Sequence, residues 1–444
     1  MKKILVLGAG LVARPMVRYL LGIPDFEVTV ASRTVSKAQD IVEGNSRGHA
    51  TALLADDDAA LDVLVKGHDL TVSLLPYTLH VAVAKHCLEW KKPLVTTSYV
   101  SDAMRALDSE AKKAGVILLN EIGLDPGIDH MSAMQIIERV KAKGGRVTSF
   151  MSYCGGLPAP EANDNPLGYK FSWSPKGVVM AGRNDARYLK DGKEVFVPGD
   201  ELFSHRWPLE IEGAGRFEAY PNRNSLPYVG LYGLEGTRTM FRGTLRNPGW
   251  CETLKAIADL GILSEEPVAG LAQMTCAGWF RKHLSGAGST RQSAAQRLGL
   301  EQDHPILERF AWLGFFDDEP VGMDKGSDLD VLAKLMLDRM QYKPGERDMI
   351  VLHHEFKAES RNQESETRDE TVHSTLVDFG VPNGDSAMAR TVSLPAAVAV
   401  KMILTGTVHL TGVHIPVRRE IYEPVLAELS ELGIRFTEKV TPMP

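Results

Sequence analysis

The chain has 444 residues, of which 44% are hydrophobic and 24% are charged, and its formal net charge is −7. This length exceeds what one hydrophobic core usually organises, so we expect a soluble globular protein of two or three domains. The acidic balance argues against a nucleic-acid-binding protein, and the lack of any run of about 18 apolar residues argues against a transmembrane helix.

Six short apolar runs alternate with helical patterns through residues 1–125. Each run is nearly continuous in Val, Leu and Ile, as in strands that are covered on both faces. The alternation predicts an α/β fold with a doubly wound parallel sheet of the Rossmann type. The runs read KILVLG, EVTVAS, ATALLAD, DLTVSLLP, PLVTTS and VILLNEIG.

A glycine turn follows the first run and has the pattern GxGxxA. Gly8 permits the tight turn, Gly10 lets the backbone approach a pyrophosphate, and Ala13 takes the place of the third glycine. Leu11 and Val12 complete the turn, and the helix that follows presents unpaired N–H groups to the phosphates. Because the motif joins a strand to a helix within an alternating pattern, it predicts a bound dinucleotide.

The second run ends on Ser32, Arg33 and Thr34, at the place where NAD-binding units carry Asp or Glu. A carboxylate there would repel a 2′-phosphate, whereas two hydroxyls and a guanidinium bind one well. We therefore expect NADP(H) in preference to NAD(H). The alternative interpretation of Arg33 is a surface arginine beside a helix cap.

Ligands of a doubly wound sheet lie outside the carboxyl ends of its strands. The later strand ends are therefore expected to complete the cofactor site and to begin the substrate site. Tyr99 and Asp125 are expected near the nicotinamide and the substrate, although Asp125 has an alternative role as the N-cap of a helix starting at Pro126. The further cofactor-binding candidates are Asp56, Leu75, Pro76, Thr97 and Ser98.

After the first domain, residues 1–125, the pattern changes to longer strand-like runs that are separated by long insertions. This change predicts an inserted α+β region over residues 126–390. The charged residues 358–370 predict a solvated hairpin tip. Residues 391–444 are expected to pack back on the first domain.

The stretch from Ser152 to Val178 is rich in Gly, Pro, Asn and aromatic residues and reads SYCGGLPAPEANDNPLGYKFSWSPKGV. The pattern alone predicts a long structured loop, a kind of segment that is often functional. Together with NEIGLDPGIDH, TTSYVS, YPNRNS, RGTLRNPGW, RFAWLGFF, ERDMIVLHH and STLVDFG, it resembles the saccharopine reductases. These are the NADP-dependent, glutamate-forming saccharopine dehydrogenases of the aminoadipate pathway of lysine metabolism.

The resemblance extends in order over nearly the whole chain and implies a homodimer whose Rossmann domain carries the inserted region. It implies that this inserted region serves substrate binding and dimerisation. It implies that L-glutamate condenses with L-2-aminoadipate 6-semialdehyde and that NADPH reduces the resulting imine to saccharopine. It also implies that Phe171 or Trp173 lines the substrate pocket. The saccharopine-binding residues implied by resemblance are Ser98, Tyr99, Asp125, Arg223 and Thr244.

Proton transfer is needed to form and dehydrate the carbinolamine that precedes the imine. Asp125, Tyr99 and Cys154 are the candidate catalytic residues, and Asp125 is also a candidate for stabilising the iminium charge. No metal site is expected, because His353 and His354 project from opposite faces of one strand.

Two alternatives to this function stay open at the level of sequence. A related dehydrogenase of the carboxynorspermidine type would join another amine to an aldehyde carboxylate, and a non-catalytic protein would bind NADP as a sensor. All three hypotheses require small-molecule ligands and no nucleic-acid or membrane partner. The four cysteines are far apart in sequence, which favours reduced thiols and a cytoplasmic location.

Overall fold

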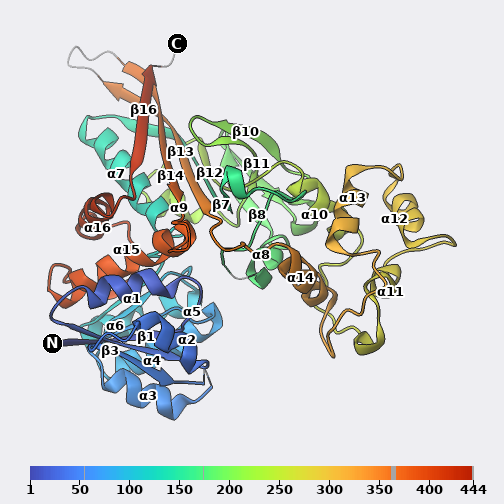
Figure 1. Cartoon of the computed structure of the whole chain (residues 1–444). Coiled ribbons are helices and arrows are strands. Elements are labelled where there is room, and N and C mark those ends of the chain that lie inside the picture. The colour runs from blue at the N-terminus through green and yellow to red at the C-terminus, as the bar shows by residue number, and fades with distance from the viewer. Residues whose placement is uncertain (55, 174, 362–366, 443–444) are drawn as a thin grey trace.

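The computed structural model describes residues 1–54, 56–173, 175–361 and 367–442 (Figure 1). Two sheets organise the described residues, one parallel and one mixed. Figure 1 shows the N-terminal sheet and its helices below the second sheet, with a group of helices from the middle of the chain extending to one side.

The first sheet has seven parallel strands in the order β15-β6-β5-β4-β1-β2-β3. This is the strand order of a dinucleotide-binding fold with β15 added at one edge, so the predicted doubly wound sheet is confirmed. Its strands are β1 (Lys2–Leu7), β2 (Phe26–Ser32), β3 (Gly48–Ala52), β4 (Leu70–Ser73), β5 (Leu94–Thr96), β6 (Ile117–Leu119) and β15 (Gly412–His414).

Both faces of this sheet are covered, as the continuous apolar runs predicted. In β1, Ile4 and Val6 pack into one core, whereas Leu5 and Leu7 pack into another on the opposite face. The connecting helices supply this cover. They are α1 (Ala13–Leu21), α2 (Val35–Val42), α3 (Asp58–Lys66), η1 (Tyr77–Leu79), α4 (His80–Glu89), α5 (Asp102–Arg105) and α6 (Asp108–Ala114).

The second sheet is mixed and runs in the order β10-β11-β12-β7-β13-β14-β16, with β8 and β9 attached beside β12. Only the β12–β7 pair on this path is parallel, and this pair places β12 directly against the strand that follows the first domain. The strands are β7 (Arg146–Pro158), β8 (Ala186–Lys190), β9 (Lys193–Val197), β10 (Trp207–Ile211), β11 (Gly215–Pro221), β12 (Thr239–Arg246), β13 (Asp348–Arg361), β14 (Thr367–Phe379) and β16 (Phe436–Pro442).

The helix after residue 125 begins later than the sequence predicted. It is α7 (Ile128–Ala142), its N-cap is Gly127, and the predicted capping role of Asp125 is therefore wrong. Gly127 has a φ of 148° and lies so close to Gly123 that an added Cβ would be 2.0 Å from the Gly123 carbonyl oxygen. The close approach of Gly127 to Gly123 keeps Pro126 and Gly127 out of the helix. The Asp125 carboxylate is therefore available for other partners.

The remaining helices belong mainly to the long insertions of the second sheet. The group that extends to the side in Figure 1 contains α10 to α13, and its aromatic residues Trp279, Phe280 and Phe310 belong to a core that continues to the second sheet. The helices of the insertions are η2 (Pro160–Ala162), α8 (Pro175–Ala181), η3 (Gly199–Glu201), α9 (Pro227–Leu231), α10 (Trp250–Asp259), η4 (Leu271–Gln273), α11 (Cys276–Arg281), α12 (Thr290–Leu298), α13 (Pro305–Leu313) and α14 (Asp328–Arg339).

The C-terminal segment contributes to both sheets. Helix α15 (Ala387–Leu404) packs against α1 and α16 (Arg419–Glu431), β15 joins the first sheet, and β16 joins the second. By length and composition α15 is apolar enough to cross a membrane, but 72% of its apolar window is buried inside the protein, which accounts for that composition. The predicted boundaries at residues 125 and 390 stay predictions.

The predicted hairpin tip lies between β13 and β14. These strands pair in antiparallel register as far as Arg361 and Thr367. Residues 362–366, which form the centre of the predicted tip, lie outside the described residues.

Candidate active site

The glycine turn has the geometry that a dinucleotide requires. Gly8 has a φ of 108°, and a Cβ there would lie 3.1 Å from the Leu74 carbonyl oxygen, so the turn needs glycine. A Cβ added at Gly10 would meet no atom within 4 Å, so open space faces the turn. Ala13 is fully buried where α1 meets the sheet, and no side chain caps the helix. These features fit a pyrophosphate bound to backbone N–H groups.

The end of β2 presents the residues predicted to bind a 2′-phosphate. The Thr34 N–H donates to Ser32 Oγ at 3.2 Å, so the two residues form a compact turn. The Arg33 and Thr34 side chains are exposed, and the Thr34 hydroxyl does not cap α2. A guanidinium and two hydroxyls are thus gathered at the edge where the ribose of a dinucleotide lies.

The other predicted cofactor residues lie at the same edge of the sheet. Asp56 and Pro76 are exposed, and Leu75, Thr97 and Ser98 are partly buried. Each follows the carboxyl end of its strand, as the doubly wound topology requires.

His80 fixes the position of the Ser98 hydroxyl. Its Nε2 lies 2.9 Å from Ser98 Oγ and 3.1 Å from Thr96 Oγ1, and its Nδ1 lies 2.9 Å from Ser73 Oγ. Burial lowers the pKa of His80 to about 4, so the ring is neutral at neutral pH. The ring therefore acts as a fixed polar support for the strand ends that border the substrate side of the site.

Tyr99, Asp125 and Arg242 form a close cluster between the two sheets. The Tyr99 hydroxyl donates to Asp125 Oδ1 at 2.9 Å, and Arg242 Nη2 donates to the same hydroxyl at 3.2 Å. Arg242 also contacts the Asp125 carboxylate and donates to Asp129 Oδ2 at 2.7 Å. The sequence predicted that Tyr99 and Asp125 lie together, but it did not predict Arg242.

The environments of the two carboxylates push their pKa values apart. Burial raises the pKa of Asp125, against the effect of Arg242 and with the help of the neighbouring Asp129 charge. Burial acts in the same direction on Asp129, but the charges of His130 and Arg242 outweigh it and lower the pKa of Asp129. Asp125 is therefore the weaker acid of the two and Asp129 the stronger, the pattern that separates a proton donor from a permanent carboxylate.

A second layer of polar side chains supports this cluster. His130 Nε2 lies 2.8 Å from Glu121 Oε2, and its Nδ1 lies 2.5 Å from the Tyr232 hydroxyl. The Val100 N–H donates to Glu121 Oε1 at 3.0 Å, which ties the layer to the loop that carries Tyr99. The His130 ring has no exposed surface, so this layer is shielded from solvent at its centre.

Strand β12 presents Arg242, Thr244 and Arg246 on one face, because side chains alternate along a strand. The Arg246 side chain is buried, and among the described residues no carboxylate lies within 4 Å of it. Its Nη1 donates only to the adjacent Leu245 carbonyl, at 2.8 Å, and its Nε has no partner. The guanidinium stacks over the rings of Tyr169 and Trp250, 4.8 and 5.5 Å from their centres. A buried guanidinium that lacks a carboxylate is still costly, so this arrangement indicates a site for an anionic ligand.

Arg223 reaches the cluster from the turn after β11. Its guanidinium lies 5.2 Å from the centre of the Tyr99 ring, and it is exposed. Its φ of 54° is uncommon for a residue with a side chain. No ion pair of Arg223 with a carboxylate occurs in the described parts of the chain, so its charge faces the open side of the site.

Cys154 pairs with Thr244 across β7 and β12 and lies in the field of the same charged groups. Burial raises its pKa well above the ordinary value, with a further contribution from Asp125, so the thiol stays protonated. Phe171 packs edge-to-face on Tyr169, and Trp173 packs between the two main cores. Thus Cys154 and Thr244 lie beside the cluster, whereas Phe171 lies in one hydrophobic core and Trp173 packs against both.

Arg242 and Arg246 are the residues that the sequence interpretation missed. The segment RGTLRNPGW was recognised, but only Thr244 was carried over from it. The signal was present, because a strand through Thr239–Arg246 must place Arg242, Thr244 and Arg246 on one face.

The sequence matches two family descriptions that together cover most of the chain. They are the saccharopine dehydrogenase NADP binding domain, over residues 4–119, and the saccharopine dehydrogenase C-terminal domain, over residues 123–434. The chain is 42% identical to the saccharopine dehydrogenase (NADP+, L-glutamate-forming) of Pyricularia oryzae, and the match covers 99% of both proteins. It is also 42% identical, with the same coverage, to the protein of that name in Saccharomyces cerevisiae.

Two further comparisons support this relationship. The mitochondrial alpha-aminoadipic semialdehyde synthase of Mus musculus is 38% identical over 99% of this chain, which corresponds to 48% of that longer protein. The solved structure of apo saccharopine dehydrogenase (L-Glu forming) from Saccharomyces cerevisiae matches with a TM-score of 0.89 and 40% identity, covering 99% of this chain and 100% of that one. The chain therefore belongs to the saccharopine dehydrogenase family.

Proposed function

We propose that this protein reduces the imine of L-glutamate and L-2-aminoadipate 6-semialdehyde to saccharopine with NADPH, reversibly, in lysine metabolism. The observation that carries the proposal is a pair of guanidiniums without carboxylate partners, Arg223 and Arg246, beside the Tyr99–Asp125–Arg242 cluster. Saccharopine has three carboxylates, and a planar guanidinium binds a carboxylate with two parallel hydrogen bonds. The full-length relatives named for this reaction agree with the proposal.

The substrate residues divide between binding and proton transfer. Arg223 and Arg246 are proposed to hold carboxylates, with Thr244 and Ser98 offering hydroxyls nearby. Phe171 and Trp173 are proposed to close the apolar side of the pocket. The separation of Arg246, buried on β12, from Arg223, exposed on a turn, suits a long ligand with charges at both ends.

Asp125 is the proposed proton donor for dehydration of the carbinolamine. Its side chain is 10% exposed, in contrast to the 2% of Asp129, so it is the carboxyl that faces the open side of the cluster. Its raised pKa keeps it protonated further toward neutral pH, and Tyr99 and Arg242 hold it in place. As the carbinolamine C–O bond breaks, the proton passes to the departing oxygen and water leaves, and the resulting carboxylate stabilises the iminium.

The cofactor residues orient the reaction at the carboxyl ends of the strands. NADPH, when bound, supplies the hydride that reduces the iminium carbon. Gly8, Gly10 and the first turn of α1 are proposed to bind its pyrophosphate, and Ser32, Arg33 and Thr34 its 2′-phosphate. Cys154 stays protonated and is therefore a poor base, and we propose that it lines the pocket beside Thr244.

The direct test follows the loss of NADPH absorbance with purified protein, L-glutamate and the semialdehyde. Oxidation of NADPH that requires both glutamate and the semialdehyde supports the proposal. Consumption with other amines but not with glutamate would indicate a dehydrogenase of the carboxynorspermidine type. Tight NADPH binding without consumption of any pair would indicate a sensor.

Asp125→Asn tests the proton-transfer role. If Asp125 acts as an acid, the reductive rate falls as the pH rises through its raised pKa, because the protonated form is lost. The variant is expected to lower kcat by about 10²- to 10⁴-fold and to remove this limb of the pH profile. Asp129→Asn is expected to keep the limb but to shift it to lower pH, because the Asp129 charge no longer raises the pKa of Asp125. An unchanged kcat and an unchanged limb in Asp125→Asn would exclude the role.

We further propose that the protein is a cytoplasmic homodimer. The resemblance to saccharopine reductases supports the dimer, and the four unpaired cysteines, three of them buried, support a reducing compartment. Light scattering coupled to gel filtration measures the dimer, and fractionation of the native cells locates the protein.

A further inference from the structure

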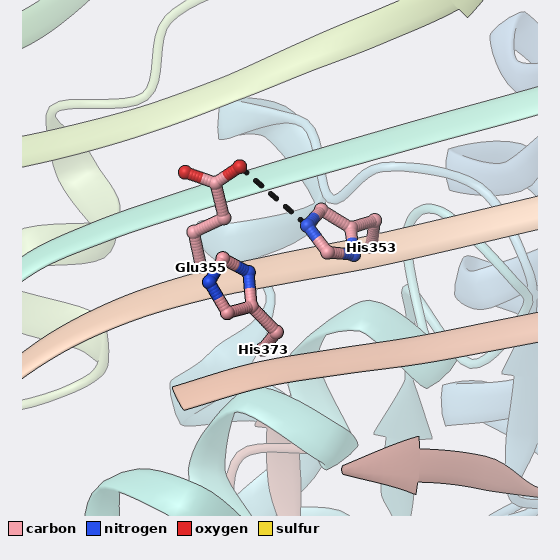
Figure 2. Close-up of side chains that lie close together, drawn as sticks. All are labelled: His353, Glu355 and His373. Atoms are coloured by element: carbon pink, nitrogen blue, oxygen red, sulfur yellow. Dashed lines mark ion pairs between the residues drawn. The ribbon is translucent and has the colours of Figure 1, made fainter. Parts of the chain in front are cut away.

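We propose that His353, Glu355 and His373 form a binding site for a divalent transition metal, with Zn²⁺ as the preferred occupant (Figure 2). One ligand atom from each side chain lies within 4.8 Å of the others. The site is on the second sheet and lies outside the proposed substrate pocket, so it does not depend on the proposed reaction.

The strand pairing brings the three side chains onto one face. His353 and Glu355 are two residues apart on β13, so they project to the same side. His373 on β14 is directly opposite Glu355 in the antiparallel register, and the two imidazole rings stack with centroids 5.5 Å apart. Figure 2 shows the three side chains converging from the two strands. Cys154 pairs instead with Leu352, so the active-site cluster lies on the opposite face.

A second-layer contact orients His353 as in many metal sites. Its Nδ1 lies 2.8 Å from Thr375 Oγ1, on the neighbouring strand, and its Nε2 lies 3.5 Å from Glu355 Oε1. A hydrogen bond from Nδ1–H to a fixed oxygen leaves the Nε2 lone pair free for a metal. The same hydrogen bond fixes the orientation of the His353 ring.

The charges of the site favour a cation. Glu355 supplies a carboxylate whose ion-pair partner among the described residues is His353, another of the three ligands. The nearby cation Lys439, opposite His373 on β16, is held by Glu212 at 2.6 Å.

Two imidazoles and one carboxylate are the ligand set of zinc sites that keep one open position. Ligand atoms about 2.0–2.2 Å from a tetrahedral Zn²⁺ lie roughly 3.4 Å apart, so small side-chain rotations close the site. The chain has another three-residue group, Asp62, His86 and Glu89. There both ring nitrogens of His86 already face carboxylates, so it is the weaker candidate.

The test titrates untagged, full-length, metal-free protein with Zn²⁺ alone by calorimetry and with Co²⁺ by absorption spectroscopy. The wild type is expected to bind one tight equivalent, and the Co²⁺ spectrum is expected to be that of a tetrahedral site without thiolate. His373→Asn and Glu355→Gln are each expected to weaken binding by at least tenfold. His86→Asn, the matched control, is expected to retain it.

Thr375→Val keeps all three ligands and removes only the second-layer hydrogen bond. Loss of such a contact typically weakens metal binding by about 10- to 100-fold, and the same direction is expected here. NADPH binding by each variant shows that it is folded. The proposal is overturned if the wild type binds no Zn²⁺ at micromolar concentration, or if His373→Asn and Glu355→Gln bind it as tightly as the wild type.

Discussion

Arg33 occupies the position at which a carboxylate would bind the ribose 2′-hydroxyl of NAD. Its side chain is exposed and lies beside Ser32 and Thr34, so it is available for a 2′-phosphate. A charge-assisted hydrogen bond contributes roughly 1.5–3 kcal/mol. Arg33→Ala is therefore expected to reduce the NADPH-to-NADH ratio of kcat/KM by about 10- to 150-fold, mainly through a higher KM for NADPH.

Lys37→Ala is the matched control for this change, because Lys37 is an exposed cation in the first turn of α2. It is expected to leave the cofactor preference nearly unchanged. Equal preferences in the wild type and in Arg33→Ala would support the alternative interpretation of Arg33 as a surface residue beside a helix cap.

Arg246 is the residue whose role depends most on the structure. Its buried guanidinium lacks a carboxylate partner, and a substrate carboxylate would supply that partner. Arg246→Met keeps the apolar stem and removes the charge, and it is expected to lower kcat/KM for the semialdehyde or glutamate by about 10- to 150-fold. Steady-state kinetics with each substrate varied in turn identify which carboxylate it binds.

Arg238→Gln, at an exposed position just before β12, is the control for Arg246→Met. It is expected to change neither KM nor kcat. If Arg246→Met also leaves both KM values unchanged while NADPH binding is retained, then Arg246 does not bind substrate.

The sequence predicted residues that follow strand ends better than residues that lie within strands. Tyr99 and Asp125 could be placed because parallel strands bring their carboxyl ends to one edge. Arg242 depends on the parallel pairing of β12 with β7, which joins segments about ninety residues apart in the sequence. No local pattern encodes that pairing, so Arg242 was not predicted beside Asp125.

At the scale of elements, α15 is held at its N-terminus by a residue of β13. Asp348 is buried and accepts from the N–H groups of Ala387 and Met388 at 2.6 and 2.8 Å. Ser386, the N-cap, accepts from the Ala389 N–H at 3.0 Å. Asp348→Ala leaves two helix donors unpaired and is expected to cost about 1–3 kcal/mol of unfolding free energy, measured by urea denaturation.

Ser386→Ala removes one cap bond at the same helix end and is expected to cost about 0.5–2 kcal/mol. Asp324→Ala, at an exposed position, is expected to stay within about 0.5 kcal/mol of the wild type. A loss in Asp348→Ala no larger than that in Asp324→Ala would mean that the end of α15 does not depend on β13.

Most of the strands that were predicted are buried along their length. In the first sheet β1, β2, β4, β5 and β6 are mainly buried, so hydrophobicity identifies them, whereas the edge strand β3 has no buried residue. Several residues of the strands β8 to β11 are exposed, so the apolar pattern of these strands is weak. The helix start at Ile128 was misplaced because the proximity of Gly127 to Gly123, and not a local capping signal, determines it.

At the scale of the whole molecule, the fold gives His353 and His354 partners that could not be predicted from the sequence. His354 projects inward, where its Nε2 lies 2.8 Å from Ser132 Oγ on α7, while His353 projects to the other face. The alternation was predictable from the strand. The partners were not, because α7 and β14 reach this strand only through the tertiary fold.

The inward histidine predicts how the stability of the whole protein depends on pH. Burial lowers the pKa of His354 to about 3, far below the ordinary value of about 6.5 that it regains on unfolding. Because the folded pKa is depressed, its contribution is present above about pH 6.5 and is lost as the pH falls toward 3. Between pH 7 and pH 5 this one group is expected to lower the unfolding free energy by about 2 kcal/mol.

His354→Gln retains a polar partner for Ser132 but cannot titrate in this range. Urea denaturation at pH 7 and pH 5 should therefore show a smaller loss of stability in this variant than in the wild type. His409→Gln, which replaces an exposed imidazole, should keep the full loss. A wild-type unfolding free energy that is the same at both pH values would contradict the prediction. The pKa of His80 is lowered to about 4, so its protonation should also lower the stability of the folded protein over this range. A constant unfolding free energy would therefore contradict the lowered pKa of His80 as well.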